Sequence, residues 1–434
     1  MNRRSKSGAQ FCRTRWKIAP WEIFILLPIC SCVATQAGAS DLVPTDIMPP
    51  ADIVQPPADA ITPYAGYSVG YDSNLLRLQN SAAAQALGIG SDLSDTTQRY
   101  LFGLAVDKTL SRQHLTANLN VTKVDYDRFG ELDHYDKNLA ANWNWHAGDH
   151  FEGNVGASYS QGLTPFIDFH LLERNIRTEE NAYADGSWLF HPSWRVRGGL
   201  TYTKLKYDLA SQQPLDNTRN QTEAGLDYLA ASGSTIGLQL RHTHADFPNP
   251  ELDNGLLVFN GYNQDEVKAK IDWLLTGKTQ LHFLGGWVSR KQDAASVRNF
   301  SGVNSRLSAD WSPTGKIDVT VSGWREIGAV DDLSTIYSLN RGASLASAWQ
   351  YSEKIRLVAQ VKYQKRDFGP SAGTGTLGNI NQNDILRDTA LSVVYNPTQR
   401  WRVQLSGIRS TQTVKSGPGG YVSNGVTLNT RYAF

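Results

Sequence analysis

The sequence predicts an all-β transmembrane protein: an up-and-down antiparallel β-barrel of about 18 strands with both termini in the periplasm. Three observations predict this fold, namely a secretion signal at the N-terminus, hydrophobicity that alternates with period two, and an aromatic C-terminal segment. Only 19% of the 434 residues are charged, whereas soluble domains average about 25%. A closed barrel also removes the strand edges that so many strands would otherwise expose.

Residues 1–39 have the composition of a secretory signal peptide. Six basic residues precede the short apolar stretch at 23–29, and the small residues at 37–39 provide a cleavage site. Cleavage after Ala39 is the main prediction, and a lipoprotein-type cleavage before Cys32 is the alternative. Residues 40–61 are then a Pro-rich periplasmic linker, and residues 62–434 form the outer-membrane barrel.

Cleavage after Ala39 changes both the cysteine count and the charge. All three cysteines lie before this position, so the mature chain has no disulfide, thiol nucleophile or cysteine metal site. The segment also holds six of the 42 basic residues and one of the 41 acidic residues, which leaves 36 basic against 40 acidic. This balance favours no nucleic-acid partner.

Period-two alternation indicates strands whose two faces have different surroundings. In the segment 194–202 the even positions are apolar or glycine, as at Val196 and Leu200, whereas the odd positions include Arg195 and Arg197. About 18 such segments occur, near 62–72, 97–108, 112–126, 134–147, 150–162, 177–190, 193–207, 218–231, 234–246, 262–275, 278–290, 298–312, 315–328, 335–350, 353–367, 382–396, 399–411 and 420–434. A barrel of 16 strands is the alternative.

The connections between these segments alternate in length. Short turns such as 147–149 and 276–277 are separated by longer links such as 73–96 and 163–176. This alternation is typical of outer-membrane barrels, whose short turns face the periplasm and whose long loops face outward.

The polar parity of the strands is predicted to face the lumen. Its charged members carry both signs, which suits a hydrated conduit for a neutral or weakly charged, hydroxyl-rich solute. A salt-bridged interior without a transport role is the alternative. The predicted lumen-lining residues are Arg195, Arg197, Glu223, Asp227, Arg241, Lys268, Lys270, Asp272, Arg356, Lys362 and Arg402, with Arg431 on the last strand.

The C-terminal segment resembles the last strand of outer-membrane barrels. Leu428, Tyr432 and Phe434 form an apolar series that ends on an aromatic residue, and we interpret it as the signal read by the barrel assembly machinery. The predicted location is therefore the outer membrane of a Gram-negative bacterium, with membrane lipids and lipopolysaccharide as further partners.

Three motifs raise the possibility of chemistry. Gly373–Gly378 matches a dinucleotide-binding fingerprint, but it lies in a predicted loop without the following helix that the motif needs. Tyr71–Asn74 resembles the nucleophile segment of outer-membrane phospholipases, but Tyr71 stands where those enzymes have a histidine general base. His242 and His244 share one strand face with apolar residues, which favours an interfacial position over a metal site. The sequence predicts no enzyme, cofactor or metal site.

Several short stretches resemble a known family, the EpsL-like outer-membrane β-barrels encoded with exosortase-linked exopolysaccharide biosynthesis operons. The matching stretches are Tyr71–Arg77, Ser111–Gln113, Asp310–Lys316 and Trp324–Glu326. The resemblance implies a role in exopolysaccharide biosynthesis or export, with the polymer and periplasmic or inner-membrane export components as partners.

The predicted function is therefore an outer-membrane conduit or accessory for exopolysaccharide, working by passive guidance through a polar lumen. A general or sugar-selective porin is the first alternative, and an outer-membrane phospholipase-like enzyme is the second.

Overall fold

The computed structural model describes residues 60–167, 169–253, 256–293, 299–332, 335–369, 383–415 and 419–434. The predicted signal peptide, nearly all of the predicted linker and the motif at Gly373–Gly378 lie outside the described residues. The first strand begins at Ala60, two residues before the predicted start of the barrel.

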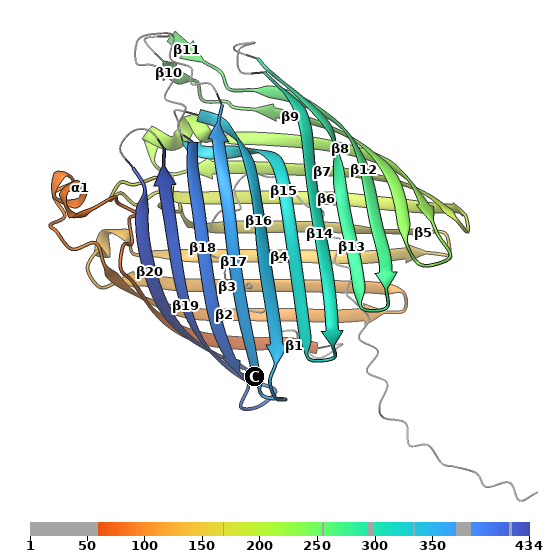
Figure 1. The fold of residues 1–434 in the computed structure, drawn as a ribbon, viewed down its shortest axis with the longest axis horizontal. Helices are drawn as coiled ribbons and strands as arrows, with labels where there is room; N and C mark the ends of the chain where they lie inside the picture. The colour runs from red at the N-terminus through yellow and green to blue at the C-terminus, as the bar shows by residue number, and fades with distance from the viewer. Residues whose placement is uncertain are drawn as a thin grey trace, which may run out of the picture. The chain divides into compact units, whose positions relative to one another are not determined.

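The described residues form a closed antiparallel sheet of 18 strands (Figure 1). The last strand pairs with the first, from Tyr64 and Ala433 at one end to Asp72 and Gly425 at the other, and this pairing closes the barrel. The predicted fold class and strand number are confirmed, and the alternative of 16 strands is wrong. In chain order the strands are β1 (Ala60–Asp72), β2 (Asp95–Leu110), β3 (Gln113–Tyr126), β4 (His134–Ala147), β5 (Phe151–Leu163), β6 (Ile176–His191), β7 (Trp194–Tyr207), β8 (Asn217–Leu229), β9 (Thr235–Asp246), β12 (Tyr262–Thr276), β13 (Thr279–Gln292), β14 (Phe300–Thr314), β15 (Ile317–Asp332), β16 (Thr335–Gln350), β17 (Ile355–Phe368), β18 (Asn383–Tyr395), β19 (Trp401–Val414) and β20 (Tyr421–Ala433).

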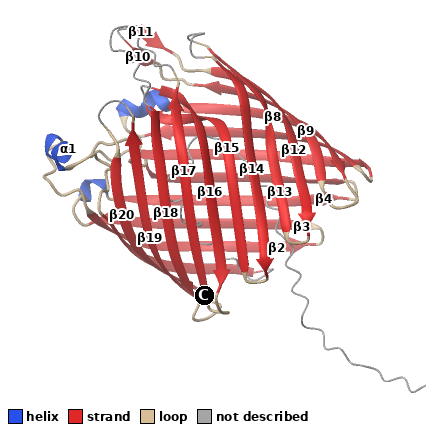
Figure 2. Ribbon diagram, in the orientation of Figure 1, coloured by secondary structure: helices blue, strands red, loops and turns tan. Residues whose placement is uncertain are grey.

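The two ends of the barrel differ. Short turns such as 111–112 and 277–278 join the strands at one end, which we call the turn end. The opposite end, the loop end, carries the short helices and a separate hairpin (Figure 2). These elements are α1 (Ser81–Ala86), η2 (Gly130–Leu132), η3 (Ala210–Leu215), β10 (Glu251–Asp253) and β11 (Leu256–Val258). Within the described residues, none of the helices is long and apolar enough to cross a membrane.

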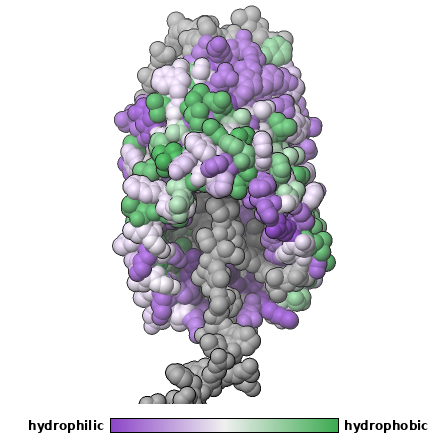
Figure 3. All heavy atoms as spheres, turned by 90° about the vertical axis from the view of Figure 1, so that its right-hand side faces the viewer, coloured by the Kyte–Doolittle hydropathy of each residue, from purple (hydrophilic) through white to green (hydrophobic). Residues whose placement is uncertain are grey.

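The apolar parity of the strands lies on the outside of the barrel. Leu200 on β7 is 60% exposed and Leu238 on β9 is 50% exposed, although both belong to the apolar series of their strands. Figure 3 shows such apolar side chains, in green, on the surface of the barrel. A folded protein in water rarely exposes so many large apolar side chains, so this surface requires an apolar medium or a partner.

Aromatic side chains gather at both ends of the exposed apolar surface. At the turn end Trp194 contacts Tyr228 with ring centroids 5.2 Å apart, and Trp349 contacts Tyr351 at 5.4 Å. Nearer the loop end Tyr202 is exposed on the same face of β7 as Trp194. The eight residue steps from Trp194 to Tyr202 span roughly 26 Å along the strand at about 3.3 Å per residue.

A hydrophobic cluster joins several connections at the loop end. Leu76 and Leu78, from the connection after β1, pack with Phe129, Leu132 and Phe166 from the two connections after β3 and β5. These residues are buried, so the three connections form one packed unit, the loop platform.

The stretch 71–77 anchors the loop platform to the barrel wall. The Asn74 side chain accepts from the Leu78 backbone N–H at 2.9 Å and donates to the carbonyl oxygens of Leu78 and Val422. Arg77, with a positive φ of 57°, forms an ion pair with Asp72 at 2.8 Å. These contacts give the residues of this stretch a local structural role.

One hairpin leaves the wall at the loop end. The pairing of β14 with β15 stops at Ser305 and Arg325, whereas the pairing of β15 with β16 continues to Asp332 and Thr335. In Figure 1 the upper part of this hairpin, in teal, curves across the loop end. Ile327 and Tyr337 of the hairpin pack against Val288 and Phe300.

Candidate functional site: the barrel interior

A continuous network of charged side chains covers part of the inner surface, on β5, β7, β8, β9 and β12. We call it the charged wall, and its members are Glu152, Arg195, Arg197, Glu223, Asp227, Arg241, Glu266 and Lys268. All of them have the parity opposite to that of exposed apolar residues on the same strands, which are Phe151, Leu200, Leu226, Leu238 and Val267.

Asp227 is the centre of the first half of the charged wall. Its carboxylate accepts from Arg195 Nη2 at 3.0 Å and from Arg197 Nε at 3.1 Å. The Asp227 side chain is 0% exposed. Arg197 also pairs with Glu223, so that one arginine of β7 joins two carboxylates of β8.

Glu223 and Glu266 join the second half of the network. Arg241 lies between them, with Nη2 at 3.0 Å from the Glu223 carboxylate and Nη1 at 3.8 Å from that of Glu266. Glu266 also pairs with Lys268. Arg241 and Lys268 are only 7% and 5% exposed, so the charges of this half are largely buried against one another.

The remaining predicted lumen-lining residues lie outside this network. Lys270 and Asp272 are 3.6 Å apart and partly exposed. Lys362 lies 5.9 Å from the centroid of the Trp324 ring, and Arg402 donates to the Asn396 side chain at 3.2 Å. Arg356 is partly exposed on β17. Arg431 stacks over the Tyr64 ring at 5.2 Å.

Sequence reasoning missed several charged interior residues. Glu152 and Glu266 complete the charged wall, and Arg366 forms a separate pair with Asp384, with Nε at 2.9 Å from the carboxylate. The signal that could have found Glu266 is its parity, which matches that of Lys268 in the same alternating segment.

A second region of the inner surface carries neutral amides instead of charges. Its side chains come from β3, β4 and β5 and are partly exposed. We call this region the amide wall, and its members are Asn118, Asn120, Asn138, Asn142, Asn144 and Asn154.

Hydrogen bonds connect the amide wall from strand to strand. The Asn138 amide donates to Asn120 at 3.2 Å, Asn120 donates to Asn118 at 3.2 Å, and the Ser160 hydroxyl donates to Asn138 at 2.9 Å. Nearer the turn end, Asn144 donates to Asn154 at 3.1 Å. The bonds hold each side chain in one orientation along the inner face.

Two tyrosines brace the amide wall. The Tyr64 hydroxyl donates to Asn118 at 3.0 Å, and the Tyr183 hydroxyl donates to Asn142 at 2.9 Å. Each ring lies over a glycine of the neighbouring strand. A Cβ at Gly103 would lie 2.2 Å from the Tyr64 ring, and one at Gly156 would lie 2.4 Å from the Tyr183 ring.

At the loop end Arg290 of β13 lies beside two tyrosine rings, one of which, Tyr337, belongs to the inward hairpin of β15 and β16. The Arg290 guanidinium lies 4.1 Å from the Tyr262 ring centroid and 6.0 Å from that of Tyr337, and its Nε donates to Gln264 at 2.7 Å. Because Tyr337 belongs to the hairpin, the hairpin occupies space on the inner side of β13.

The phospholipase-like stretch and the histidine pair form hydrogen bonds with neighbouring strands. The Ser73 hydroxyl accepts from the Asn424 backbone N–H at 2.8 Å, and Tyr71 is exposed. His242 and His244 hydrogen-bond to different residues, Asp265 at 2.7 Å and Asn263 at 2.9 Å. Among the described residues, no group of three or more His, Cys, Asp or Glu side chains is arranged to hold a metal ion.

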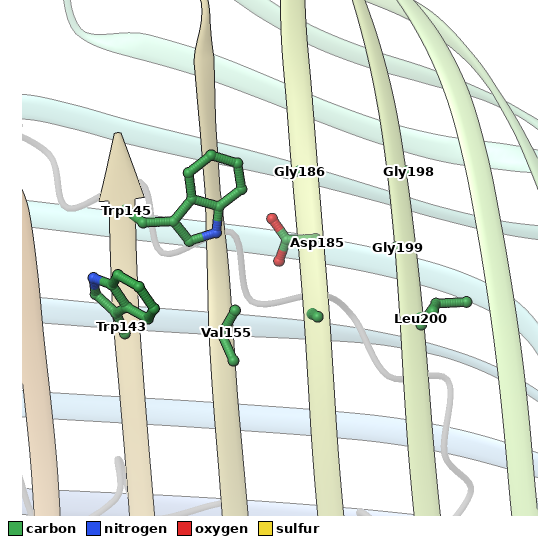
Figure 4. A pocket seen from close by; sticks show the side chains of 9 residues that line it. Trp143, Trp145, Val155, Asp185, Gly186, Gly198, Gly199 and Leu200 are labelled. Carbon is green, nitrogen blue, oxygen red and sulfur yellow. The ribbon is translucent and has the colours of Figure 1, made fainter. Parts of the chain in front are cut away.

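A depression of about 540 Å³ crosses β4 to β7 (Figure 4). Trp143, Val155 and Leu200, which are exposed on the outer surface, line it together with Trp145 and several glycines. Most of its lining is therefore apolar exterior, and Asp185 is the one charged residue among the residues that line it.

The C-terminal residues complete the barrel at the turn end. Tyr432 and Phe434 are exposed with ring centroids 5.3 Å apart, and the Phe434 backbone N–H donates to the Pro63 carbonyl oxygen at 2.9 Å. Leu428 is exposed on the same side of β20.

Comparison with known proteins finds no matching family model and no matching curated protein. Among solved structures the chain is similar to Pseudomonas aeruginosa OccK9 (OpdG), with a TM-score of 0.47 and 12% identity over 86% of this chain and 98% of that chain. It is also similar to P. aeruginosa OccK2 (OpdF), with a TM-score of 0.47 and 9% identity over 87% and 99% of the two chains. For the P. aeruginosa siderophore receptor PirA, the TM-score is 0.43 and the identity 10% over 88% and 81%. Likeness at this level does not extend to function.

Proposed function

We propose that this chain is a porin-like passive channel of the outer membrane that admits hydroxyl-rich solutes. The observation that carries the proposal is the contrast across each strand, with large apolar side chains exposed outside and a hydrogen-bonding surface inside. Closed barrels of 16 to 18 strands are wide enough to leave an aqueous channel. The hairpin that carries Ile327 and Tyr337 supplies a constriction at the loop end.

The outer surface supports a position in the membrane. Outer-membrane barrels carry an apolar band about 25 Å tall between two girdles of aromatic residues. Trp194 and Tyr202 lie towards the two ends of such a band on β7, and at the usual strand tilt their roughly 26 Å separation corresponds to a height of about 20 Å. The turn end then faces the periplasm, together with the C-terminus and the start of β1.

An exopolysaccharide conduit is the second candidate, and the family-like stretches favour it. Much of this resemblance falls on structural positions, because Asn74 and Arg77 anchor the loop platform and 310–316 includes the turn between β14 and β15. The amides and hydroxyls of the interior suit a neutral polymer as well as small sugars. In this second role the channel has exopolysaccharide and periplasmic or inner-membrane export components as partners.

An enzymatic role receives no support from the described site. The Ser73 hydroxyl contacts the Asn424 backbone, and activation of a serine nucleophile requires an adjacent base. We therefore infer transport as the function.

Ion conductance tests the channel. The purified full chain, inserted in a planar lipid bilayer, is expected to give stable conductance steps, and vesicles that contain it are expected to swell in neutral sugars. A correctly folded barrel that gives neither result contradicts the proposal. Deleting the gene and measuring secreted polysaccharide separates the two candidates, because only an export conduit lowers secretion.

The C-terminal residues are proposed as the assembly signal. Deleting Phe434, or replacing Tyr432 and Phe434 with Ser, is expected to leave the chain in the periplasm. Replacement of exposed Tyr395 with Ser, at the turn end of β18, is the matched control. Normal outer-membrane amounts of the C-terminal variants contradict this role.

A further inference from the structure

We propose that the amide wall is a binding track for neutral oligosaccharides and that the buried centre of the charged wall, Asp227 and Glu266, does not contact the solute. The inference rests on the proposed channel function and names the substrate class and the residues that recognise it. It differs from the sequence prediction, which placed the charged residues on the solute path.

Asn120 and Asn138 of the amide wall have hydrogen-bonding capacity that is not used within the wall. An asparagine side chain has two N–H donors and an oxygen with two acceptor sites. Within the amide wall, Asn138 donates once to Asn120 and accepts once from Ser160. Asn120 likewise donates once to Asn118 and accepts once from Asn138. Each of these two amides therefore keeps one donor and one acceptor site that sugar hydroxyls can use.

The amides of the amide wall are more exposed than the carboxylates at the centre of the charged wall. Asn120, Asn138 and Asn142 are partly exposed, and Ser160 beside them is exposed. In the charged wall, by contrast, Asp227 is fully buried and Glu266 is 4% exposed. A solute in the lumen therefore reaches the amides more easily than the central carboxylates.

Three amides of the amide wall are aligned along one strand, β4. Asn138, Asn142 and Asn144 lie on one face of β4, and the six residue steps from Asn138 to Asn144 span about 20 Å. At the usual strand tilt this length corresponds to a height of about 15 Å, more than half of a typical outer-membrane apolar band of about 25 Å. The amides therefore form a row in the direction in which a solute moves.

The hydrogen bonds that the amide wall offers to a solute are individually weak. Conduction requires binding that is favourable enough for entry but weak and repeated enough for release. Neutral hydrogen bonds are weaker than charge-assisted ones, and they do not select the sign of the solute. A row of neutral amides braced by Tyr64 and Tyr183 provides this kind of contact.

The experiment measures interruptions of the ion current by a linear neutral glucose oligomer in planar bilayers. The test variant combines Asn120→Ala, Asn138→Ala and Asn142→Ala. The matched control combines Ser308→Ala, Ser322→Ala and Ser344→Ala, which removes neutral polar groups from the inner face of β14, β15 and β16. Both variants are first checked for heat-dependent electrophoretic mobility, which reports a folded barrel.

The test variant is expected to shorten the oligomer residence time about tenfold, the sum of several weak hydrogen bonds, with the ion conductance nearly unchanged. The control is expected to keep the wild-type residence time. Should the triple variant fail to fold, Asn138→Ala alone is expected to shorten the residence time about twofold.

Three results would overturn the inference. Equal residence times in the test variant and the wild type show that the amides do not bind sugar, and equal shortening in both variants shows that the effect is not specific to the amide wall. Interruption by a sulfated oligomer but not by the neutral one shows that charge controls recognition. In all three cases the wild type conducts ions, whereas a failure of the proposed channel function appears as the absence of conductance.

Discussion

The charged wall and the amide wall are built on strands of the same barrel, yet their polar groups are used differently. In the charged wall Arg197 pairs with two carboxylates of β8, and Arg241 pairs with carboxylates of β8 and β12, so opposite charges are paired within the wall. In the amide wall Asn120 and Asn138 are also linked across strands, but each retains hydrogen-bonding capacity. A charged interior residue is therefore not necessarily a residue that meets the solute.

Energetics explain why the two walls differ in their tolerance of change. Burying an ion costs several kcal/mol, and the pair repays this cost only while both partners are present. A neutral hydrogen bond contributes about 0.5–1.5 kcal/mol net, and a partly exposed amide can replace a lost partner with water. The charged wall therefore has a structural role, and the amide wall is free to serve binding.

The largest expected effect comes from removing the centre of the charged wall. Asp227→Ala leaves Arg195 and Arg197 without a buried carboxylate that both contact. We expect a loss of about 3 kcal/mol in the free energy of unfolding, at the lower end of the range for breaking buried pairs because Arg195 is partly exposed. Urea unfolding in lipid vesicles, followed by tryptophan fluorescence, measures the loss.

The matched variant on the amide wall is Asn142→Ala, which removes the acceptor of the Tyr183 hydroxyl. We expect a loss of about 1 kcal/mol or less. If the two variants lose equal stability, the difference between the walls does not exist.

The next prediction concerns β7, which carries Arg195 and Arg197 of the charged wall. It tests which of the two faces of this strand meets lipid. Leu200→Arg places a charge on the exposed apolar surface, and we expect a loss of about 2–4 kcal/mol near the bilayer midplane. Thr201→Arg, one residue later and on the inner face, is expected to cost less because its side chain reaches the lumen. Similar losses for both variants in vesicle unfolding would contradict an apolar exterior and a hydrated interior.

Much of the barrel is readable from the sequence because each strand reports its own two faces. The alternation assigns Leu200 and Arg197 to opposite faces of their strand without any knowledge of neighbouring strands. The predicted segment 335–350 also coincides with β16. The period of two is local, so a single strand is enough to recognise it.

The organisation of the interior depends on relations between strands, which the sequence does not state. Arg241 meets Glu223 and Glu266 because β9 lies between β8 and β12 in a particular register. The partial exposure of Asn138 and the inward bend that carries Tyr337 also depend on how neighbouring strands are placed. The loop platform likewise joins Leu76 to Phe166 across long sequence distances.

A smaller effect is expected within the charged interior itself, at a pair outside the buried network. Lys270 and Asp272 are 3.6 Å apart and about a quarter to a third exposed. Lys270→Met is expected to change the free energy of unfolding by less than about 1 kcal/mol, because water screens an exposed pair. A loss as large as that of Asp227→Ala in the same urea experiment would show that burial is not what distinguishes the central pairs.

The smallest effect is expected at the turn end, where an ion pair lies wholly in solvent. Arg112 Nη1 lies 2.6 Å from the Asp149 carboxylate, and this hydrogen bond lowers the pKa of Asp149 below its ordinary value of about 3.9. A carboxyl with a lowered pKa contributes stability that is present above the ordinary pKa and is lost as the pH falls through the lowered one. Carbon-detected NMR titration of Asp149 in detergent micelles is expected to show the lowered pKa, and Arg112→Gln is expected to return it towards the ordinary value. The urea midpoint of Arg112→Gln should match that of the wild type near neutral pH, because an exposed pair contributes little. A clear drop in that midpoint would mean that charge pairs stabilise this barrel even without burial, and the contrast between its two inner walls would then need another cause.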